Sequence, residues 1–454
     1  MARQERGPQR ARRNEDTGTA ASLMASDCGE LFPEARAALP AVTLRSAVRQ
    51  PNVFRKRIAK VDPGVRAGDW VIVYAPRPES SQDEEEESGG ELQIIGYGIY
   101  NPRSEIALRI VRFGVESPDE GFWDRLLERA VSLRKEWLRL DEVANAYRVI
   151  HGEADGIPGL VVDRYDQVLS LEAFSYGMYL RGQEVAERLA RLLGTRHWYV
   201  RTSPFMLSQE GIERPQLRSA DAPRFTTISE FGTRFRIQLD EQSHKTGFFC
   251  DQRDNRKMLA GFCRDKTVLD LCCYTGGFSV QAKKLGGAAE VTGVDLDADP
   301  LELAKANANL NQVKAKFVQA DVFPYMRDML RSGRQFDVVV LDPPKLIRSR
   351  AELEEGARKH LDLNRLAIRL VKPGGLFLSC TCAGLLSTAE FTQIVARAAR
   401  QAGQDEERFA GGFRHGRDLQ IFAKTGAAAD HPVSGNALEG EYLNAIWARV
   451  DDPS

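Results

Sequence analysis

The sequence predicts a protein of several domains whose carboxyl-terminal half is a doubly wound α/β domain. Three observations lead to this prediction. The chain has 454 residues, more than one ordinary domain holds. From about residue 237 onward, apolar runs of strand length alternate with helical segments. Ahead of them come short β-rich runs and then a mixed α/β region. We therefore expect a small β-barrel, an α/β linking domain and a mainly parallel sheet with helices on both faces.

The composition favours a folded protein with sizeable buried cores. Hydrophobic residues make up 43% of the chain, charged residues 28%, and the formal net charge is −1. No uncharged apolar run approaches the ~20 residues of a membrane span, so no membrane partner is expected. Because the net charge is near zero, any binding to nucleic acid must come from local basic patches.

The cysteines indicate a reducing, cytoplasmic setting. There are seven, an odd and scattered set unlike a disulfide framework. Cys380 and Cys382 are separated by one residue, and no complementary CxxC or HxxxH pair exists. Structural zinc sites need two ligand pairs, so we expect no metal.

Residues 1–37 read as a flexible basic tail, because they are rich in Arg, Gly, Gln and Pro and lack apolar periodicity. They contain no apolar segment of a secretory signal. Residues 38–115 contain strand-like runs at 69–76 and 91–101. Between these runs the acidic stretch 79–91 reads as a solvated loop.

Residues 116–236 mix helix and strand. The segment 121–138 has helical spacing of apolar residues, and 147–165 gives two strand-like runs around a turn marked by Gly and Pro. His151 lies beside that turn. It could serve as a catalytic base, but a single His at a turn is more often structural, and we expect the structural role.

The region 237–454 places polar groups directly after its apolar runs, where ligands bind in such sheets. Asp270 precedes the loop that contains Gly276 and Gly277, whose missing side chains allow close approach to a ligand. Asp295 ends the next run, placed for two ribose hydroxyls, and Asp321 ends the third, placed for an adenine amino group. The fingerprints GxGxxG and GK[ST] are absent, which argues against a bound pyrophosphate.

This order of groups, followed by LDPPK at 341–345 and the glycine turn of LVKPGGLFL at 370–378, matches the S-adenosylmethionine-dependent methyltransferases of the doubly wound class. Beyond the class, the chain resembles the bacterial 23S ribosomal RNA 5-methylcytosine methyltransferases of the RlmI type. The stretches that carry the resemblance are HKTGFFCDQRDNR, DLCCYTGGFSV, DPPK, SCTCAG, HGEADGIPGLVVDRY, ADHPV and EGEYLNAIWARV. They cover nearly everything after the tail.

The resemblance implies a PUA-type RNA-binding domain at 38–115, a central α/β domain at 116–236 and the methyltransferase domain at 237–454. It implies S-adenosylmethionine as cofactor, and a ribosomal RNA or ribosomal subunit as partner. It also implies a set of cofactor-binding residues: Lys245, Thr246, Gly247, Phe248, Asp251, Gln252, Arg253, Asp270, Tyr274, Thr275, Gly276, Gly277, Asp295, Asp321 and Asp342. Whether the protein forms a homodimer is left open.

The same resemblance assigns Cys382 as the nucleophile, with Gly384 two residues on, and leaves Cys380 as a small hydrophobe within a strand. A thiol suits the chemistry, because C5 of cytosine is a poor nucleophile until a thiolate adds to C6. Asp342 would hydrogen-bond the N3 edge of the flipped base. Pro343 would shape the pocket and Lys345 would supply positive potential.

The predicted RNA contacts are Arg45, Arg49, Arg55 and Lys56, a local basic cluster suited to phosphates, with a solvated surface as the alternative. Here the chain departs from the family. VRQPNVF at 48–54 carries Gln50 and Asn52 where relatives often have His and Trp, and the acidic stretch is a further insertion.

Two alternative functions remain open from the sequence. One is guanine N-methylation of ribosomal RNA, such as 7-methylguanine, which needs no thiol. Enzymes that methylate exocyclic amines usually place an aromatic residue after DPP, to stack on the base. This chain has Lys345 there, which argues against methylation of an exocyclic amine. The other is an RNA-binding assembly factor without catalytic activity, which an eroded cofactor loop would have favoured.

Overall fold

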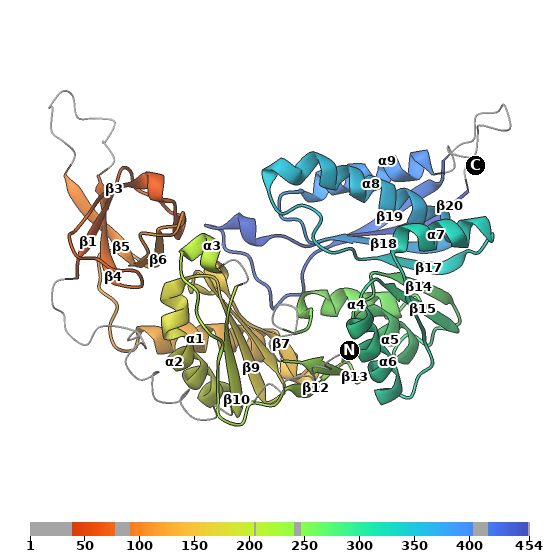
Figure 1. The fold of residues 1–454 in the computed structure, drawn as a ribbon, viewed down its shortest axis with the longest axis horizontal. Coiled ribbons are helices and arrows are strands. Elements are labelled where there is room, and N and C mark those ends of the chain that lie inside the picture. The colour runs from red at the N-terminus through yellow and green to blue at the C-terminus, as the bar shows by residue number, and fades with distance from the viewer. Residues whose placement is uncertain (1–38, 78–90, 204–205, 240–246, 403–415, 453–454) are drawn as a thin grey trace, which may run out of the picture.

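The computed structural model describes residues 39–77, 91–203, 206–239, 247–402 and 416–452, and arranges them in three units (Figure 1). We call them the N-terminal unit (39–113), the central unit (122–238) and the C-terminal unit (250–451). The tail at 1–37, the acidic stretch up to residue 90, and Lys245 with Thr246 lie outside the described residues.

The N-terminal unit is a six-stranded sheet in the order β2-β6-β5-β4-β1-β3. Neighbouring strands are antiparallel except β1 and β4, which run parallel. Its elements are β1 (Ala41–Leu44), β2 (Asn52–Val53), the 3-10 turn η1 (Arg55–Arg57), β3 (Ile58–Val61), β4 (Trp70–Pro76), β5 (Leu92–Tyr100) and β6 (Leu108–Phe113). Since β2 and β3 form open edges among the described residues, the closed barrel and the PUA-type assignment stay predictions.

Strand β4 shows how this unit is held to the next one. Its residues alternate between two faces, as a strand requires. Val71 and Val73 are buried in the unit's own core, while Trp70 packs into the core of the central unit. The ring of Trp70 meets that of Trp123 edge to face, with their centroids 6.2 Å apart. One sheet therefore serves two cores.

The central unit is a five-stranded sheet in the order β11-β10-β9-β8-β7, with helices on one face. Its larger helix α2 begins at the N-cap Ser175 and ends at Gly194, which adopts a φ of 66°. The elements are α1 (Phe122–Ser132), η2 (Leu133–Trp137), η3 (Leu140–Glu142), β7 (Ala146–His151), η4 (Gly152–Asp155), β8 (Leu160–Tyr165), β9 (Val168–Ala173), α2 (Tyr176–Leu193), β10 (His197–Thr202), α3 (Met206–Glu210) and β11 (Leu217–Arg218). A hairpin of β12 (Phe225–Glu230) and β13 (Thr233–Gln238) leads to the last unit.

The C-terminal unit is a seven-stranded sheet in the order β16-β15-β14-β17-β18-β20-β19. The first five strands are parallel, and β20 runs antiparallel to both of its neighbours. Helices α4, α5 and α6 cover one face and α7, α8 and α9 the other (Figure 1). The prediction of a doubly wound, mainly parallel sheet is confirmed.

The elements of this unit are η5 (Cys250–Gln252), α4 (Arg253–Ala260), β14 (Thr267–Leu271), α5 (Gly277–Lys284), β15 (Glu290–Asp295), α6 (Ala298–Leu310), β16 (Lys316–Gln319), α7 (Val322–Arg331), β17 (Phe336–Leu341), η6 (Arg350–Glu352), α8 (Leu353–Arg369), β18 (Val371–Thr381), α9 (Thr388–Gln401), β19 (Asp418–Thr425), η8 (Leu438–Gly440) and β20 (Asn444–Asp451). The glycine turn expected before the late strand lies instead inside β18, where Gly374 adopts a φ of 76° and the pairing with β17 shifts register. The chain reverses its direction of travel across the sheet between β14 and β17, so the loops after these two strands diverge and leave a crevice.

A buried carboxylate joins the first two units. Glu210 is fully buried and accepts hydrogen bonds from the side chains of Asn101, Ser104 and Arg109, and from the backbone N–H of Tyr176. The Arg109–Glu210 ion pair measures 3.1 Å. Because a buried charge needs such partners, Glu210 fixes how the N-terminal unit lies on the central one.

A second buried carboxylate joins the central and C-terminal units. Asp430 accepts both terminal nitrogens of Arg253, at 3.0 and 2.9 Å, and the backbone N–H of Arg148 at 2.8 Å. The backbone oxygen of Asp430 accepts from Arg134. Burial would raise the pKa of Asp430, but the neighbouring His431 and Arg253 hold it well below the usual range.

Within the part of the chain that the structure describes, every helix falls short of the length and apolarity that crossing a membrane requires.

Candidate active site

Asp270 lies at the crevice, near the end of β14. Its Oδ2 accepts hydrogen bonds from the backbone N–H of Ser279 at 2.9 Å and from its hydroxyl at 2.6 Å. Its Oδ1 is buried and has no hydrogen-bond partner among the described residues. Burial raises the pKa of Asp270 to about 6. An oriented, buried oxygen without a protein donor is suited to a donor group on a ligand.

The loop after β14 is held in an unusual backbone conformation. Cys272, Tyr274 and Gly276 have φ values of 64°, 49° and 78°. Left-handed backbone is costly for residues with side chains, so the surrounding contacts must enforce it. The backbone N–H of Tyr274 donates to Oδ2 of Asp295 at 2.8 Å, and the carbonyl of Thr275 accepts from Asn307 at 3.0 Å.

Gly276 could not be replaced without moving its neighbours. A Cβ there would lie 3.1 Å from Ala304 and 3.3 Å from the ring of Phe317, in addition to the strain of its positive φ. The next residue, Gly277, begins α5 and faces the Arg256 side chain. The loop therefore passes close to α6, β16 and the Arg256 side chain, and a side chain at either glycine would crowd them.

Asp295 and Asp321 end neighbouring strands at the same edge of the sheet. Asp295 is partly exposed, and its two oxygens accept from the backbone of Tyr274 and Asp297. Asp321 is exposed and caps α7, since its Oδ1 accepts from the N–H of Phe323 at 2.8 Å. Both carboxylates have a role in the fold, and their predicted contacts with ribose and adenine stay predictions.

The segment before α4 has two kinds of residue. Phe248 packs in the core against Phe235, and its backbone N–H and C=O both bond the hydroxyl of Tyr165. Arg253 is fully buried in its ion pair with Asp430. Gly247 fits tightly against β13, where a Cβ would lie 3.0 Å from Ile237. All three residues contact other parts of the protein. Their assignment as cofactor-binding residues therefore stays a prediction.

Asp251 and Gln252 of that segment are also buried, but their side chains bond residues of the candidate site. Asp251 accepts at Oδ2 from the Tyr442 hydroxyl at 2.6 Å, while its Oδ1 is buried without a partner among the described residues. Gln252 donates through Nε2 to Oδ2 of Asp342 at 3.1 Å. Its Oε1 accepts from Asn255 at 2.7 Å, so the amide can present only its donor side to Asp342.

Asp342 directly follows β17 and is partly exposed at the crevice. Burial within the site raises its pKa to about 7, and the nearby Asp251 and Asp270 carboxylates add to this. Its hydrogen bond from Gln252 acts in the opposite direction. The carboxyl is therefore close to half protonated at neutral pH, a state suited to proton exchange with a bound group.

The two cysteines of β18 have different surroundings. Cys380 is fully buried beside Trp447, and burial holds its pKa well above the ordinary value, with the Gln252 amide in hydrogen-bonding reach of its sulfur. Cys382 follows the end of β18 and is partly exposed. Because Leu341 on β17 pairs with Ser379 on β18, Asp342 and Cys382 follow adjacent strand ends at one edge of the sheet.

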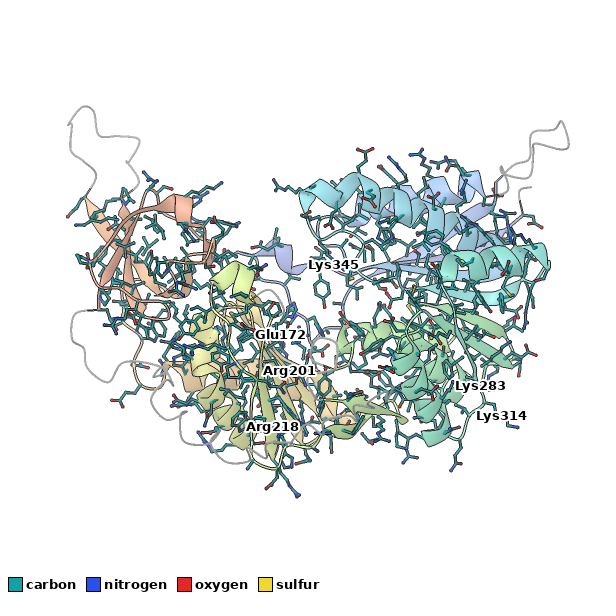
Figure 2. All side chains as sticks on the ribbon, in the orientation of Figure 1. Glu172, Arg201, Arg218, Lys283, Lys314 and Lys345 are labelled. Carbon is teal, nitrogen blue, oxygen red and sulfur yellow. The ribbon has the colours of Figure 1, made fainter. Side chains whose placement is uncertain are left out.

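The rim beside these strand ends is formed by the DPP loop and by the segment after Cys382. Pro343 is buried, whereas Lys345 is exposed and extends at the side of the C-terminal unit that faces the central unit (Figure 2). Gly384 lies against Tyr442, which approaches within 3.4 Å of the position a Cβ would take. The carboxyl edge of the sheet thus brings together the predicted Cys382, Asp342, Pro343 and Lys345.

Three residues of this site were missed by the sequence analysis. Tyr442 supports Asp251, Asn255 fixes the orientation of Gln252, and His360 bonds the Thr381 hydroxyl beside Cys382 at 3.1 Å. The contacts of Tyr442 and His360 join residues 191 and 21 positions apart, whereas that of Asn255 is local, at a separation of 3. Tyr442 lies within a stretch that carried the family resemblance, but nothing in the sequence pairs it with Asp251.

His151 is held in packing contacts, and the structural role expected for it stays a prediction. Burial, together with the charge of Arg148, lowers its pKa to about 2, so the imidazole is neutral and a very weak base. Its Nδ1 lies 2.7 Å from a guanidinium nitrogen of Arg148, and its ring packs edge to face on that of His431. It belongs to the interface between the central and C-terminal units.

The four predicted RNA contacts are exposed on the N-terminal unit, around β1, β2 and η1. Arg55 also donates to the carbonyl of Ser104, and Arg45 to that of Lys56. No group of His, Cys, Asp or Glu in the described ranges could hold a metal ion.

Comparison with known proteins adds to this geometry. Residues 214–406 match the family of S-adenosylmethionine-dependent methyltransferases. Over 407 residues the chain is 34% identical to ribosomal RNA large subunit methyltransferase I of Pseudoalteromonas atlantica, covering 88% of this chain and 95% of that protein. The protein of the same name from Enterobacter sp. strain 638 is 36% identical over 408 residues, covering 88% and 96%. The chain belongs to the ribosomal RNA large subunit methyltransferase I family.

Members of this family use S-adenosylmethionine, which is therefore the cofactor of this chain. The fold has solved counterparts. A protein assigned as a methyltransferase and complexed with SAH has a TM-score of 0.69 at 18% identity, covering 88% of this chain and 95% of that chain. A second, from Streptococcus mutans, has a TM-score of 0.69 at 17% identity, covering 90% and 100%. These likenesses extend through all three units.

The residues at the crevice fit this cofactor. Its amino group and hydroxyls are hydrogen-bond donors, and the crevice offers the unpartnered Oδ1 of Asp270 and of Asp251. The loop that contains Gly276 follows β14, the strand that carries Asp270, at the same edge of the sheet. No pyrophosphate is involved, which agrees with the missing dinucleotide fingerprint.

Proposed function

We propose that this protein methylates C5 of a cytosine in the ribosomal RNA of the large subunit, through a covalent bond between Cys382 and C6 of the base. The names of its relatives support the choice of RNA. The observation that carries the choice of C5 is Cys382 itself, a partly exposed thiol that follows β18, beside β17 and the Asp342 that follows it. The expected cytoplasmic location belongs to this same proposal.

Bound S-adenosylmethionine supplies an electrophilic methyl group on a sulfonium. Asp270, Asp295 and Asp321 would hold the cofactor, with the Gly276–Gly277 turn against it. Their task is to place the methyl group over C5 of the base and to keep water out of the crevice.

The Cys382 thiolate attacks C6 and forms a carbon–sulfur bond, and the electrons of the C5–C6 double bond move to C5. C5 thereby becomes nucleophilic enough to be methylated. Afterwards the proton on C5 leaves to a base or to solvent, the C6–S bond breaks, and the double bond returns with Cys382 released. Cys380 takes no part, because it is buried and its raised pKa keeps it protonated.

Asp342 contacts the N3 edge of the cytosine in this proposal. Negative charge builds up on the ring as the thiolate adds, and a proton shared between Asp342 and N3 offsets it. The raised pKa of Asp342, about 7, supports this role because the proton is available near neutral pH. Pro343 shapes the pocket, and the exposed Lys345 adds positive potential near the thiolate.

The target base must leave its stack to reach the crevice, as in other enzymes that act on bases. The N-terminal unit would hold the surrounding RNA through Arg45, Arg49, Arg55 and Lys56, which are exposed and suited to phosphates. Its identity as a PUA-type domain is part of this proposal, as are the ribosomal subunit as partner and the domain limits at 38–115, 116–236 and 237–454.

The experiment combines the purified protein, labelled S-adenosylmethionine and unmodified bacterial ribosomal RNA, and identifies the labelled nucleoside by mass spectrometry. We expect 5-methylcytosine with the unchanged protein and with Cys380→Ala, and no product with Cys382→Ala. A methylguanosine product that survives both substitutions would replace this proposal with guanine N-methylation. No product from any variant, with RNA binding intact, would favour an assembly factor.

A further inference from the structure

The loop after the DPP turn carries unpaired positive charge. Lys345, Arg348 and Arg350 are all exposed, and across the described ranges none of their side chains forms an ion pair or hydrogen bond, while the Glu352 carboxylate accepts from the backbone N–H of Arg348. The loop begins at Asp342, so these charges lie next to the proposed base pocket. Cations without counter-ions beside a nucleic-acid site are candidates for phosphate contacts.

The loop is fixed on the C-terminal unit. Ile347 is fully buried, and it packs so closely on α8 that a Cβ at Gly356 would lie 2.3 Å from its side chain and 2.8 Å from the carbonyl of Leu346. With Ile347 anchored, Lys345 and Arg348 on either side remain exposed. The charges are thus presented by an anchored segment, which limits the entropy lost when they bind.

Beyond this loop an open groove of about 590 Å³ runs between α8 and α9. Its apolar wall includes Leu353, Leu386 and Ile394, and its cations are Arg350 and Arg397. Leu386 lies four residues after Cys382 and Arg350 eight after Asp342, so the groove begins where the two proposed catalytic loops end.

The acidic residues of the groove are already engaged. Glu354 pairs with Arg358 at 3.1 Å, and Glu390 forms the capping box of α9 with Ser387. Arg397, like Arg350, has no ion pair among the described residues and is exposed. Glu390 keeps its negative charge in the capping box, so the groove is not positive throughout; its positive charge is concentrated at Arg350 and Arg397, which have no carboxylate partner in the described part of the chain, whereas Lys359 on α8 is neutralised by Glu355.

We propose that Arg348, Arg350 and Arg397 form a phosphate track that binds the RNA strand flanking the target nucleotide. This rests on the proposed function for the identity of the RNA. The track lies on the C-terminal unit, apart from the basic residues of the N-terminal unit, so the RNA is held on both sides of the cytosine. The apolar wall suits riboses and the faces of unstacked bases.

The test measures binding of a labelled ribosomal RNA fragment at several salt concentrations. In the variant Arg348→Gln, Arg350→Gln, Arg397→Gln, affinity should fall about tenfold, and the slope of log affinity against log salt should decrease in magnitude by about two. KM for RNA should rise while KM for S-adenosylmethionine is unchanged. Arg397→Gln alone, remote from both catalytic loops in sequence, should give a smaller change of the same kind.

The matched control for Arg397→Gln is Lys359→Gln on the neighbouring helix α8, which removes one charge of the same sign that Glu355, outside the groove, already neutralises. An unchanged salt slope in the triple variant, or an equal change in the control, would overturn the track. A missing 5-methylcytosine product with the salt slope reduced as expected would reject the proposed reaction and leave the track standing.

Discussion

At the scale of single residues, the site combines a thiol with a carboxyl group whose proton is available near neutral pH. The pKa of Asp342 is raised to about 7 because its neighbours exclude water and because Asp251 and Asp270 repel its charge. Below that pH the carboxyl is mostly protonated, and above it mostly ionised. In the proposed reaction the proton is shared with N3, so kcat/KM should fall as the pH rises above about 7.

Gln252 sets the position of that fall. Its hydrogen bond stabilises the ionised form of Asp342, so removing the bond raises the pKa of Asp342 further. Gln252→Leu should therefore shift the alkaline fall in kcat/KM to higher pH, in addition to slowing the reaction. The measurement is a pH profile of kcat/KM from about 6 to 9 for the unchanged protein, for Gln252→Leu and for the control variant described next.

The control is Gln281→Leu in α5. Gln281 is also fully buried, and neither of its amide atoms has a hydrogen-bond partner among the described residues. Its replacement removes a buried amide of the same kind without touching Asp342. An identical shift in both variants would show that general loosening, rather than the bond to Asp342, moves the profile.

At the scale of elements, the loop after β14 needs glycine at position 276 for two reasons: the positive φ, and the close contact with neighbouring side chains. Gly276 and Gly287 both have positive φ, 78° and 68°. A Cβ at Gly276 would press on Ala304 and Phe317, whereas nothing lies within 4 Å of one at Gly287. Alanine substitutions at the two positions therefore distinguish backbone strain, which both would have, from crowding, which only Gly276→Ala would have.

Gly276→Ala should weaken binding of S-adenosylmethionine by about tenfold, because the loop must shift to make room in addition to bearing strain of order 1–3 kcal/mol. Gly287→Ala bears similar strain away from the crevice and should bind the cofactor normally. Titration calorimetry of each variant checks this. Equal affinities of the two variants for S-adenosylmethionine would mean that the loop accommodates the added methyl group at position 276 without shifting.

At the scale of the whole molecule, two buried carboxylates fix the three units. Glu210 holds the N-terminal unit on the central one, and Asp430, through Arg148 and Arg134, holds the central unit on the C-terminal one. These contacts set the position of the basic residues of the first unit relative to Cys382, and in the proposed reaction that position decides how RNA is held. The units can act on one substrate only if that geometry is maintained.

Glu210→Ala should lower the free energy of unfolding by about 3–5 kcal/mol, since it leaves the charge of Arg109 buried and unpaired. It should also raise KM for RNA more than KM for S-adenosylmethionine. Glu213→Ala, an exposed change three residues away, should do neither. Denaturant unfolding and steady-state kinetics test both points, and an RNA KM unaffected by Glu210→Ala would separate the N-terminal unit from catalysis.

The sequence by itself determined the doubly wound sheet and the order of groups along its edge. Each buried parallel strand appears in the sequence as a continuous apolar run followed by a polar residue, as at Asp295 and Asp342. This pattern lies in consecutive residues, so it can be recognised without the fold. It also determined that Cys380 lies inside a strand. The family resemblance rested on stretches such as the one around Cys382, which are likewise continuous in sequence.

Only the tertiary structure decided what Phe248, Arg253 and Gln252 contact. All three belong to one short stretch, yet the first packs in a core, the second pairs with Asp430, and the third donates to Asp342. These partners lie far along the chain, and a buried side chain engages whichever group folding brings opposite it. Burial likewise set the pKa of Asp342, because desolvation depends on every unit packed around the site and on no single stretch of sequence.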